Sequence, residues 1–193
     1  MSIILDTLDT RLGARIRVER ENRGWSLTDL AERSGVSRAM INKVERGAAS
    51  PTASLLGRLS GAFGLTLSML LARTETDHVG RLVRSDEQFQ WVDPETGYIR
   101  RQIAPAPGSD IPLDVVRVEL PPDASVTFPA RNYVSVRQLI WVTDGCLTFI
   151  EGEFEHDLRA GDCLELGPPA DCTLRNRRAA SCCYLVIVLR LGR

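Results

Sequence analysis

The sequence predicts an α + β chain of two domains, in which a helical domain precedes an antiparallel β-barrel. Helical periodicity runs through residues 1–72 and includes two short helices joined by a tight turn. Residues 82–193 contain short strands separated by turn residues, and many strands at such spacing are typical of a sandwich or barrel. The polar segment between the two parts, residues 73–81, is predicted to be a linker.

Composition and charge limit the classes of protein to which the chain can belong. With 193 residues, 44% hydrophobic and 25% charged, the chain is globular rather than disordered. No apolar run is long enough for a bilayer, and the N-terminus lacks the basic start and apolar core of a signal peptide, so we expect a cytoplasmic protein without a membrane partner. Residues 1–75 carry a net charge of +3 and residues 76–193 a net charge of −4, which favours nucleic-acid contact by the first domain only.

Residues 25–47 predict the two short helices and the turn. Leu27, Leu30 and Ala31 fall at i, i+3 and i+4, which is the apolar stripe of an amphipathic helix. Gly35 follows this stripe, at the place where a left-handed residue ends a helix and turns the chain.

Capping residues mark the start of both helices. Ser26 and Asp29 form a capping box for the first helix, and Ser37 is the expected N-cap of the second. The inward face of the second helix is predicted to consist of Met40, Ile41 and Val44. Its outward face is predicted to consist of Arg38, Ala39, Asn42, Lys43 and Arg46.

The second helix of such a pair is built to lie in the major groove of DNA, although an ordinary helical hairpin within a bundle is the alternative. Arg38 stands at the start of this helix, where it can pair bidentately with guanine, and Ala39 can contact a thymine methyl group. Asn42 and Lys43 share the outward face and complete the expected base readers. Expected phosphate contacts are Ser37, Arg46, Ser50 and Thr52.

Residues 11–71 resemble the lambda-repressor-like, or Xre-type, DNA-binding domain over its whole length. The matching segments are RLGARIRVERENRGWS, SLTDLAERSG, VSRAMINKVERG and ASPTASLLGRLSGAFGLTLSMLL. The resemblance implies a domain of five helices in which residues 38–46 belong to the recognition helix. It also implies an ion pair between Arg20 on the first helix and Glu45 near the end of the third, which would brace the recognition helix.

The second domain alternates short strands with turns. The turns are predicted at DPETG, APAPGSD, PPDA, Asp144-Gly145 and Gly152. The predicted strands are 87–92, 98–103, 113–120, 138–142, 146–151, 153–158, 163–166, 172–176 and 181–191. The last strand is the most apolar, as expected of a central strand that is buried on both faces.

Residues 138–176 resemble the cupin family of small β-barrels, or jelly rolls, in their order of strands and turns. Gly145 matches the end of the first cupin motif, and Gly161 and Asn176 match the second. Metal-dependent cupins hold the ion with two His and one Glu of the first motif and one His of the second. Here those positions fall within residues 131–134, at Gln138 and at Cys172, so none of the usual ligands is present and we expect no metal and no cofactor.

A barrel of this size is either filled by side chains or holds one small ligand. Arg131 stands at a ligand position and would favour an anionic effector if buried, whereas a surface loop arginine is the alternative. The residues predicted to line an effector site are Arg131, Tyr133, Gln138, Trp141, Cys172 and Arg175, with Phe128 beside them.

All five cysteines lie in the predicted barrel, at positions 146, 163, 172, 182 and 183. In a cytoplasmic protein they are expected to be reduced, and no C-x-x-C pair predicts a zinc site. Buried structural thiols are the ordinary interpretation of cysteines in strands, and a thiol sensor centred on Cys172 is the alternative.

Together these patterns indicate a transcriptional regulator rather than an enzyme. The first domain would bind a double-stranded DNA operator, and the barrel would pair two chains into a homodimer and sense a small-molecule effector. Two alternatives remain open at this point. One is a metal-dependent cupin enzyme that retains a DNA-binding-like domain, and the other is a barrel that serves dimerisation only.

Overall fold

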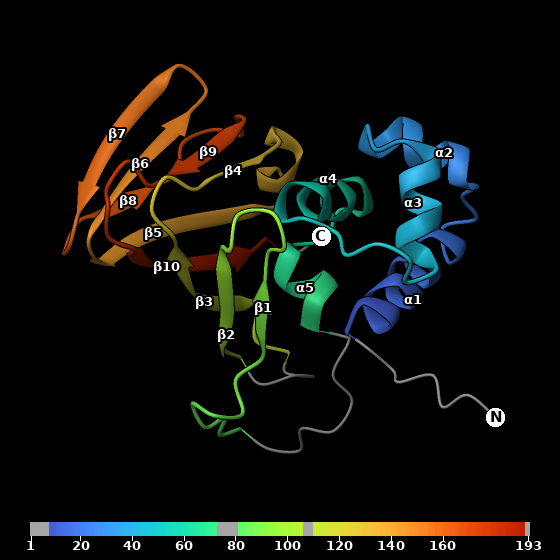
Figure 1. The fold of residues 1–193 in the computed structure, drawn as a ribbon, viewed down its shortest axis with the longest axis horizontal. Helices are drawn as coiled ribbons and strands as arrows, with labels where there is room; N and C mark the ends of the chain where they lie inside the picture. The colour runs from blue at the N-terminus through green and yellow to red at the C-terminus, as the bar shows by residue number, and fades with distance from the viewer. Residues whose placement is uncertain (1–7, 73–80, 106–109, 192–193) are drawn as a thin grey trace. The chain divides into compact units, whose positions relative to one another are not determined.

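The computed structural model describes residues 8–72, 81–105 and 110–191 (Figure 1). The chain divides into two compact units, Met1–Thr76 and Asp77–Arg193. Most of the predicted linker, residues 73–80, and the centre of the predicted APAPGSD loop, residues 106–109, lie outside the described residues. Each unit is therefore considered by itself.

The first unit is helical and confirms the predicted five-helix domain. Its helices are α1 (Leu8–Glu21), α2 (Leu27–Ser34), α3 (Arg38–Glu45), α4 (Ala53–Phe63) and α5 (Leu67–Ala72). The core is formed by side chains that recur at helical spacing, and all of them are fully buried: Leu12, Ile16, Leu30, Ile41, Val44, Leu56, Leu59 and Leu70. The apolar stripes read from the sequence are thus the surfaces on which the helices pack.

The second unit confirms the predicted antiparallel barrel. Its strands are β1 (Gln90–Val92), β2 (Ile99–Ala104), β3 (Leu113–Leu120), β4 (Ser125–Phe128), β5 (Val136–Asp144), β6 (Cys146–Glu151), β7 (Phe154–Arg159), β8 (Cys163–Glu165), β9 (Cys172–Arg175) and β10 (Cys182–Arg190), with a short 3-10 helix η1 (Ala130–Tyr133). They form one sheet in the order β1-β2-β3-β10-β5-β8 and another in the order β4-β9-β6-β7. Two antiparallel sheets of this kind are the jelly-roll architecture found in cupins.

Strand β4 was not predicted, and it is the main error in the strand assignment. It has only four residues and pairs with β9, placing Val126 and Phe128 in the core while Ser125 and Thr127 face outward. The prolines at positions 122 and 129 flank it closely, so its alternation is too short to be distinguished from a loop by sequence.

Strand β10 is central, as predicted, because it pairs with both β3 and β5. The expectation that both of its faces are buried is wrong. Tyr184, Val186 and Val188 are buried on the inner face, whereas Leu189 on the outer face is 44% exposed.

Two residues make the turns at the end of the barrel. Gly145 links β5 to β6 with a φ of 77°, a conformation that favours glycine, and a Cβ at this position would lie only 2.9 Å from the Ser181 carbonyl oxygen. Asn176 is fully buried, and its Nδ2 lies 3.0 Å from the carbonyl oxygen of Leu120 and 2.8 Å from that of Ala180. The asparagine that ends the second cupin-like motif therefore ties the β3 and β10 ends together.

None of the described helices has the length and apolar character required to cross a membrane.

Candidate functional site

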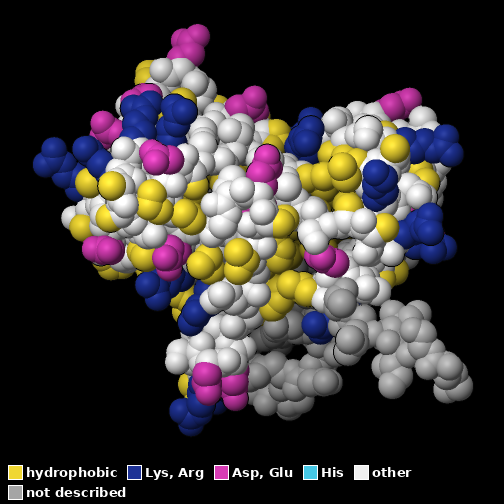
Figure 2. Space-filling model, viewed as in Figure 1, with side chains coloured by type: hydrophobic (Ala, Val, Ile, Leu, Met, Phe, Trp, Pro, Cys, Tyr) yellow, Lys and Arg dark blue, Asp and Glu magenta, His cyan; other side chains and the backbone are white. Residues whose placement is uncertain are grey.

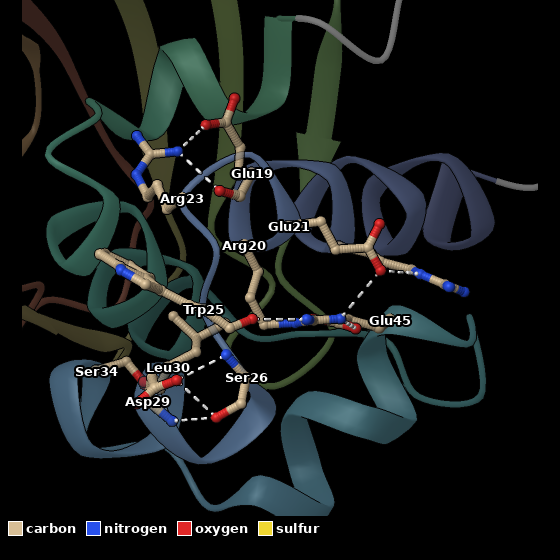
Figure 3. Close-up of polar contacts among 11 residues, drawn as sticks. Glu19, Arg20, Glu21, Arg23, Trp25, Ser26, Asp29, Leu30, Ser34 and Glu45 are labelled. Carbon is tan, nitrogen blue, oxygen red and sulfur yellow. Dashed lines mark hydrogen bonds and ion pairs between the residues drawn. The ribbon is translucent and has the colours of Figure 1, made fainter.

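The start of α2 (Figure 3), its end and the start of α3 are fixed by the capping residues that the sequence predicts. The Ser26 hydroxyl accepts from the Asp29 amide at 3.1 Å, and the Asp29 carboxylate accepts from the Ser26 amide at 2.7 Å. Gly35 ends α2 with a φ of 69°, and the Ser37 hydroxyl accepts from the Met40 amide at 3.3 Å. These bonds define the turn and the direction in which α3 leaves it.

The predicted brace between α1 and α3 is present. Arg20 Nε donates to Glu45 at 2.7 Å and Nη2 donates to the same carboxylate at 2.8 Å, while Nη1 donates to the Trp25 carbonyl oxygen at 2.9 Å (Figure 3). The hydrogen bond to Glu45 raises the pKa of Arg20. A single guanidinium therefore joins α1, the loop before α2 and the end of α3, in the bidentate geometry that only arginine provides.

A second group of contacts holds α1 against α4. Arg23 pairs with Glu19 one turn earlier, and its Nη2 donates to the Phe63 carbonyl oxygen at 2.7 Å. Trp25 stacks on Phe63 with ring centroids 5.9 Å apart. The guanidinium carbon of Arg33, on α2, lies over the Trp25 ring, 4.5 Å from its centroid. The polar groups around the recognition helix are thus bound into one rigid frame.

The backbone of α1 lies directly on the end of α3 at Gly13. A methyl group at this position would lie inside the contact distance of the Val44 carbonyl oxygen, and Glu45 backbone atoms would be 3.2 Å away. Glycine is required here by the close approach of two helices rather than by its own dihedral angles.

The predicted reading face of α3 is open to solvent. Arg38, Ala39, Asn42, Lys43 and Arg46 are all exposed, whereas Ile41 and Val44 are fully buried. The prediction that Met40 faces inward is wrong, because it is 37% exposed. An eight-residue helix buries only a narrow stripe, and Met40 lies at the edge of it.

The predicted phosphate contacts have different surroundings. Ser37 and Thr52 are the N-caps of α3 and α4, and each hydroxyl accepts an amide hydrogen while keeping its own proton for a donor bond. Ser50 donates its proton to Asp9, whose negative charge would repel a phosphate. The structure thus favours Ser37 and Thr52 over Ser50. Figure 2 shows further basic side chains on the viewed face of this unit.

The predicted effector residues of the barrel do not all face its interior. Tyr133 and Cys172 are buried, as is the neighbouring Phe128, and Gln138 is half-buried on the same strand face as Ile140. The interior placement of Trp141, Arg175 and Arg131 is wrong. Trp141 is 44% exposed on the outer face of β5, Arg175 is exposed on the outer face of β9, and Arg131 is exposed on η1.

The interior contains polar residues that the sequence did not indicate. Tyr98, Arg100 and Tyr184 are 1%, 7% and 0% exposed, and they lie on the inner face of the six-stranded sheet. Tyr133 and Cys172 are hydrogen-bonded to each other, and Tyr98 and Tyr133 act electrostatically on Tyr184. We refer to Tyr98, Arg100, Tyr133, Cys172 and Tyr184 as the interior cluster.

The interior cluster does not fit the metal that cupin barrels often hold. Burial raises the pKa of Cys172 to about 11 and raises that of Tyr133 well above its usual value, so both remain protonated and neutral. Gln138 supplies only a neutral amide. Within residues 8–72, 81–105 and 110–191, no three His, Cys, Asp or Glu side chains meet in a way that could hold a metal ion.

The same burial argues against Cys172 as a thiol sensor. Reactive cysteines have a lowered pKa and an accessible sulfur atom. Cys172 is 1% exposed and its Sγ donates to the Ala170 carbonyl oxygen at 3.4 Å. Cys182 is also buried, with a pKa raised by burial to about 12, whereas Cys163 is exposed.

These features define a helix-turn-helix domain joined to a jelly-roll barrel. Comparison with known proteins supports the first: residues 16–70 match the HTH_3 family, described as helix-turn-helix.

Curated relatives match about a third of the chain. The chain is 34% identical over 68 residues to the HTH-type transcriptional regulator SutR of Escherichia coli strain K12, covering 35% of this chain and 38% of that protein. It is 32% identical over 73 residues to the HTH-type transcriptional regulator SinR of Bacillus licheniformis, covering 37% of this chain and 66% of that protein. The matched region therefore spans less than two thirds of the length of these relatives.

One solved structure shares the fold over almost the whole chain. It is an HTH_3 family transcriptional regulator from Vibrio cholerae, with a TM-score of 0.77 at 20% identity, covering 96% of this chain and 98% of that chain.

Proposed function

We propose that this chain is a bacterial transcriptional regulator that binds a double-stranded DNA operator through α3. The observation that carries the proposal is the exposed reading face, Arg38, Ala39, Asn42 and Lys43, on a helix braced by Arg20 and Glu45. Positioned donors on a rigid helix are what base recognition in the major groove requires. The names of the relatives agree with this role, and a protein that binds chromosomal DNA would act in the cytoplasm.

Arg38 and Lys43 have distinct proposed roles. Arg38, at the first position of α3, would donate two hydrogen bonds to one guanine, as arginine does most often in the major groove. Lys43 lies five residues later and would approach a neighbouring base or phosphate. Arg46, Ser37 and Thr52 would fix the register by contacts with the phosphate backbone.

The barrel would pair two chains and sense an effector. A single short helix reads few bases, so a two-fold operator with half-sites roughly 34 Å apart is expected. Exposed apolar side chains support pairing, because Trp141 and Leu189 are each 44% exposed on the outer face of the six-stranded sheet. The neutral donors of the interior cluster support binding of a small molecule rather than metal-dependent catalysis.

The decisive experiment is selection of binding sites from fragmented genomic DNA by the full chain, followed by fluorescence anisotropy. Arg38→Ala is expected to weaken binding about 10-fold or more and to relax specificity at one base pair. Lys43→Ala is expected to weaken binding and to lower its salt dependence if the side chain contacts phosphate.

Arg159→Ala is the matched control, because Arg159 is an exposed arginine of the barrel. It should bind the selected DNA like the parent chain. If the chain selects no sequence, or if the Arg38→Ala and Lys43→Ala double variant binds as tightly as the parent, α3 is not the reading element. Sedimentation of the pure chain as a monomer at micromolar concentration would contradict pairing.

A further inference from the structure

The outer face of the six-stranded sheet has a group of apolar side chains at its centre, where strands β10 and β5 run side by side (Figure 1). Leu185 of β10 pairs with Trp141 of β5, and Ile187 pairs with Leu139. Paired residues point to the same side of a sheet, so these four side chains form one square patch. We refer to Leu139, Trp141, Leu185 and Ile187 as the outer patch.

The outer patch is accessible and belongs to a wider apolar surface. Trp141 is 44% exposed, and the other three residues of the patch are half-buried. The apolar surface continues at Leu113, Val115 and Leu189. The other sheet differs, because the outward residues of β4 and β9 are polar: Ser125, Thr127, Thr173 and Arg175. A large exposed apolar area marks an interaction surface, and tryptophan is enriched at the centres of such surfaces.

Two charged residues of opposite sign flank the outer patch on opposite sides. Arg117 of β3 pairs with Leu185, and Glu165 of β8 pairs with Leu139. Both side chains are exposed and lie on the same face as the patch. Their backbones are three strand spacings apart, roughly 14 Å. Among the residues that the structure describes, neither of the two forms an ion pair.

The side of the face that carries Arg117 is positively charged. Arg101 of β2 pairs directly with Arg117, and like charges opposite each other on a sheet are destabilising. Arg101 Nη2 donates to the Gln90 side-chain oxygen at 2.6 Å, and Arg117 Nη2 lies 3.7 Å from the Cys183 sulfur. Neither contact supplies a negative charge. A carboxylate brought to this side by another chain would offset the repulsion.

The two flanking charges are related by the diagonal of the patch that runs from Ile187 to Trp141. Arg117 lies on one side of this diagonal and Glu165 on the other. A two-fold axis along the diagonal would therefore place Arg117 of each chain opposite Glu165 of the other. It would also place the two Trp141 rings together at the centre of the contact. An interface between identical chains has to be self-complementary in this way.

We propose that a second copy of the same chain covers this face, packed sheet to sheet, with Arg117 of one chain paired with Glu165 of the other. The proposal rests on the proposed function, in which the barrel pairs two chains, and it specifies the surface that pairs them. Sheets that pack face to face lie about 10 Å apart, a gap that side chains of the size of the outer patch fill. An apolar centre with charged residues at its rim is the usual arrangement of a protein interface.

Sedimentation equilibrium of the full chain measures the dissociation constant of the dimer. Trp141→Glu should raise this constant about 100-fold, because it places a charge at the apolar centre of the contact. Phe154→Glu is the matched control, since Phe154 is 71% exposed on β7 of the other sheet. It should leave the dissociation constant unchanged.

Exchange of the two charges tests the ion pairs directly. Arg117→Glu and Glu165→Arg should each raise the dissociation constant about 10-fold or more, because each brings like charges together. The double variant has opposite charges again, with their positions exchanged, so its dissociation constant should return to within about 3-fold of the parent value. A barrel damaged by one substitution would not be rescued by the other, so recovery reports on the contact between chains.

The outcomes separate this proposal from the proposed function. A parent dimer that Trp141→Glu leaves intact, or a double variant that dissociates as readily as the single ones, rejects this face and places the pairing elsewhere. A monomeric parent rejects pairing altogether and leaves the face to a different protein. Anisotropy with a single DNA half-site, measured in the same samples, reports on α3 alone. Unchanged half-site binding by the Trp141→Glu monomer would support the DNA-binding role whichever surface pairs the chains.

Discussion

The two units use buried polar groups in opposite ways. In the helical unit, Arg20 and Glu45 satisfy each other in bidentate geometry, and the guanidinium also serves the Trp25 carbonyl group. In the barrel, the Tyr184 hydroxyl is buried with no partner among the described residues. Saturated polar groups hold a structure in one arrangement, whereas an unsatisfied group favours binding of something that satisfies it. This difference agrees with the proposed roles, in which the first unit presents a surface to DNA and the second receives a small molecule.

Removal of the Arg20–Glu45 ion pair should have the largest effect on stability. Glu45→Ala leaves the guanidinium of Arg20 in a site where its side chain is only 12% exposed, and the helical unit should lose about 3 kcal/mol of unfolding free energy. Urea unfolding followed by helical circular dichroism measures this loss. Glu32→Ala, which changes an exposed glutamate of α2, should have little effect, and equal losses in the two variants would refute the bracing role.

The barrel also contains buried polar side chains with hydrogen-bond partners, and removal of one of them, Asn176, should be the next most costly change. Asn176→Ala removes the donor that three backbone carbonyl oxygens share, at distances of 3.0, 3.1 and 2.8 Å. The barrel should lose about 2 kcal/mol, measured by urea unfolding. Asn22→Ala changes an exposed asparagine of the other unit and should be neutral. A stable Asn176→Ala barrel would mean that the turns hold without this residue.

Removal of the N-cap of α3 should have a smaller effect on the stability of the exposed helix face. Ser37→Ala loses the hydroxyl that accepts from the Met40 amide, so the first turn of α3 should fray at a cost of about 1 kcal/mol. Amide hydrogen exchange at residues 38–40 reports the fraying directly. The exposed Ser125 provides the matched control, Ser125→Ala, whose exchange in α3 should be unchanged.

The smallest effect is expected from thiol chemistry. At pH 8, iodoacetamide should alkylate the exposed Cys163 at least ~10-fold faster than Cys172, whose pKa is raised by burial to about 11. The pKa of Cys172 is higher in the folded chain than the ordinary value of 9.0, so raising the pH from 9 towards 11 ionises this thiol more readily in the unfolded chain. The free energy of unfolding should therefore be unaffected by this thiol below pH 9 and should fall as the pH rises towards 11. Mass spectrometry of the alkylated chain measures the rates, and rapid labelling of Cys172 in the folded chain would restore the sensor hypothesis.

The sequence was most informative where structure depends on near neighbours. Ser26, Gly35 and Ser37 act through bonds to residues that follow within a few positions, so their spacing reveals them. The Arg20–Glu45 pair spans 25 positions and could be predicted only through family resemblance. Strand β4 was missed because its four residues, which lie between two nearby prolines, are too few for the alternation of polar and apolar side chains to indicate a strand.

The residues that face the barrel interior were predicted less well, because the alternation of side chains along each strand was not applied. Gln138 and Trp141 are three residues apart on β5, so they face opposite sides of the sheet, and the same holds for Cys172 and Arg175 on β9. Strict alternation would have excluded Trp141 and Arg175. Arg100 and Tyr184 face the same interior because each pairs with Val118 of the intervening strand β3, and that strand order is a property of the whole sheet.

The contact at Gly13 has a consequence for how a signal can reach DNA. With the α1 backbone lying directly on the Val44 carbonyl group, no side chain separates the two helices or lets one slide past the other. Tilting α3 alone would require α1 to move with it. In the proposed regulator, an effector bound to the barrel would therefore act by relocating the helical unit as a whole. The measurement that would follow such regulation is the distance between the two α3 helices of the proposed dimer on DNA, rather than the shape of either helix.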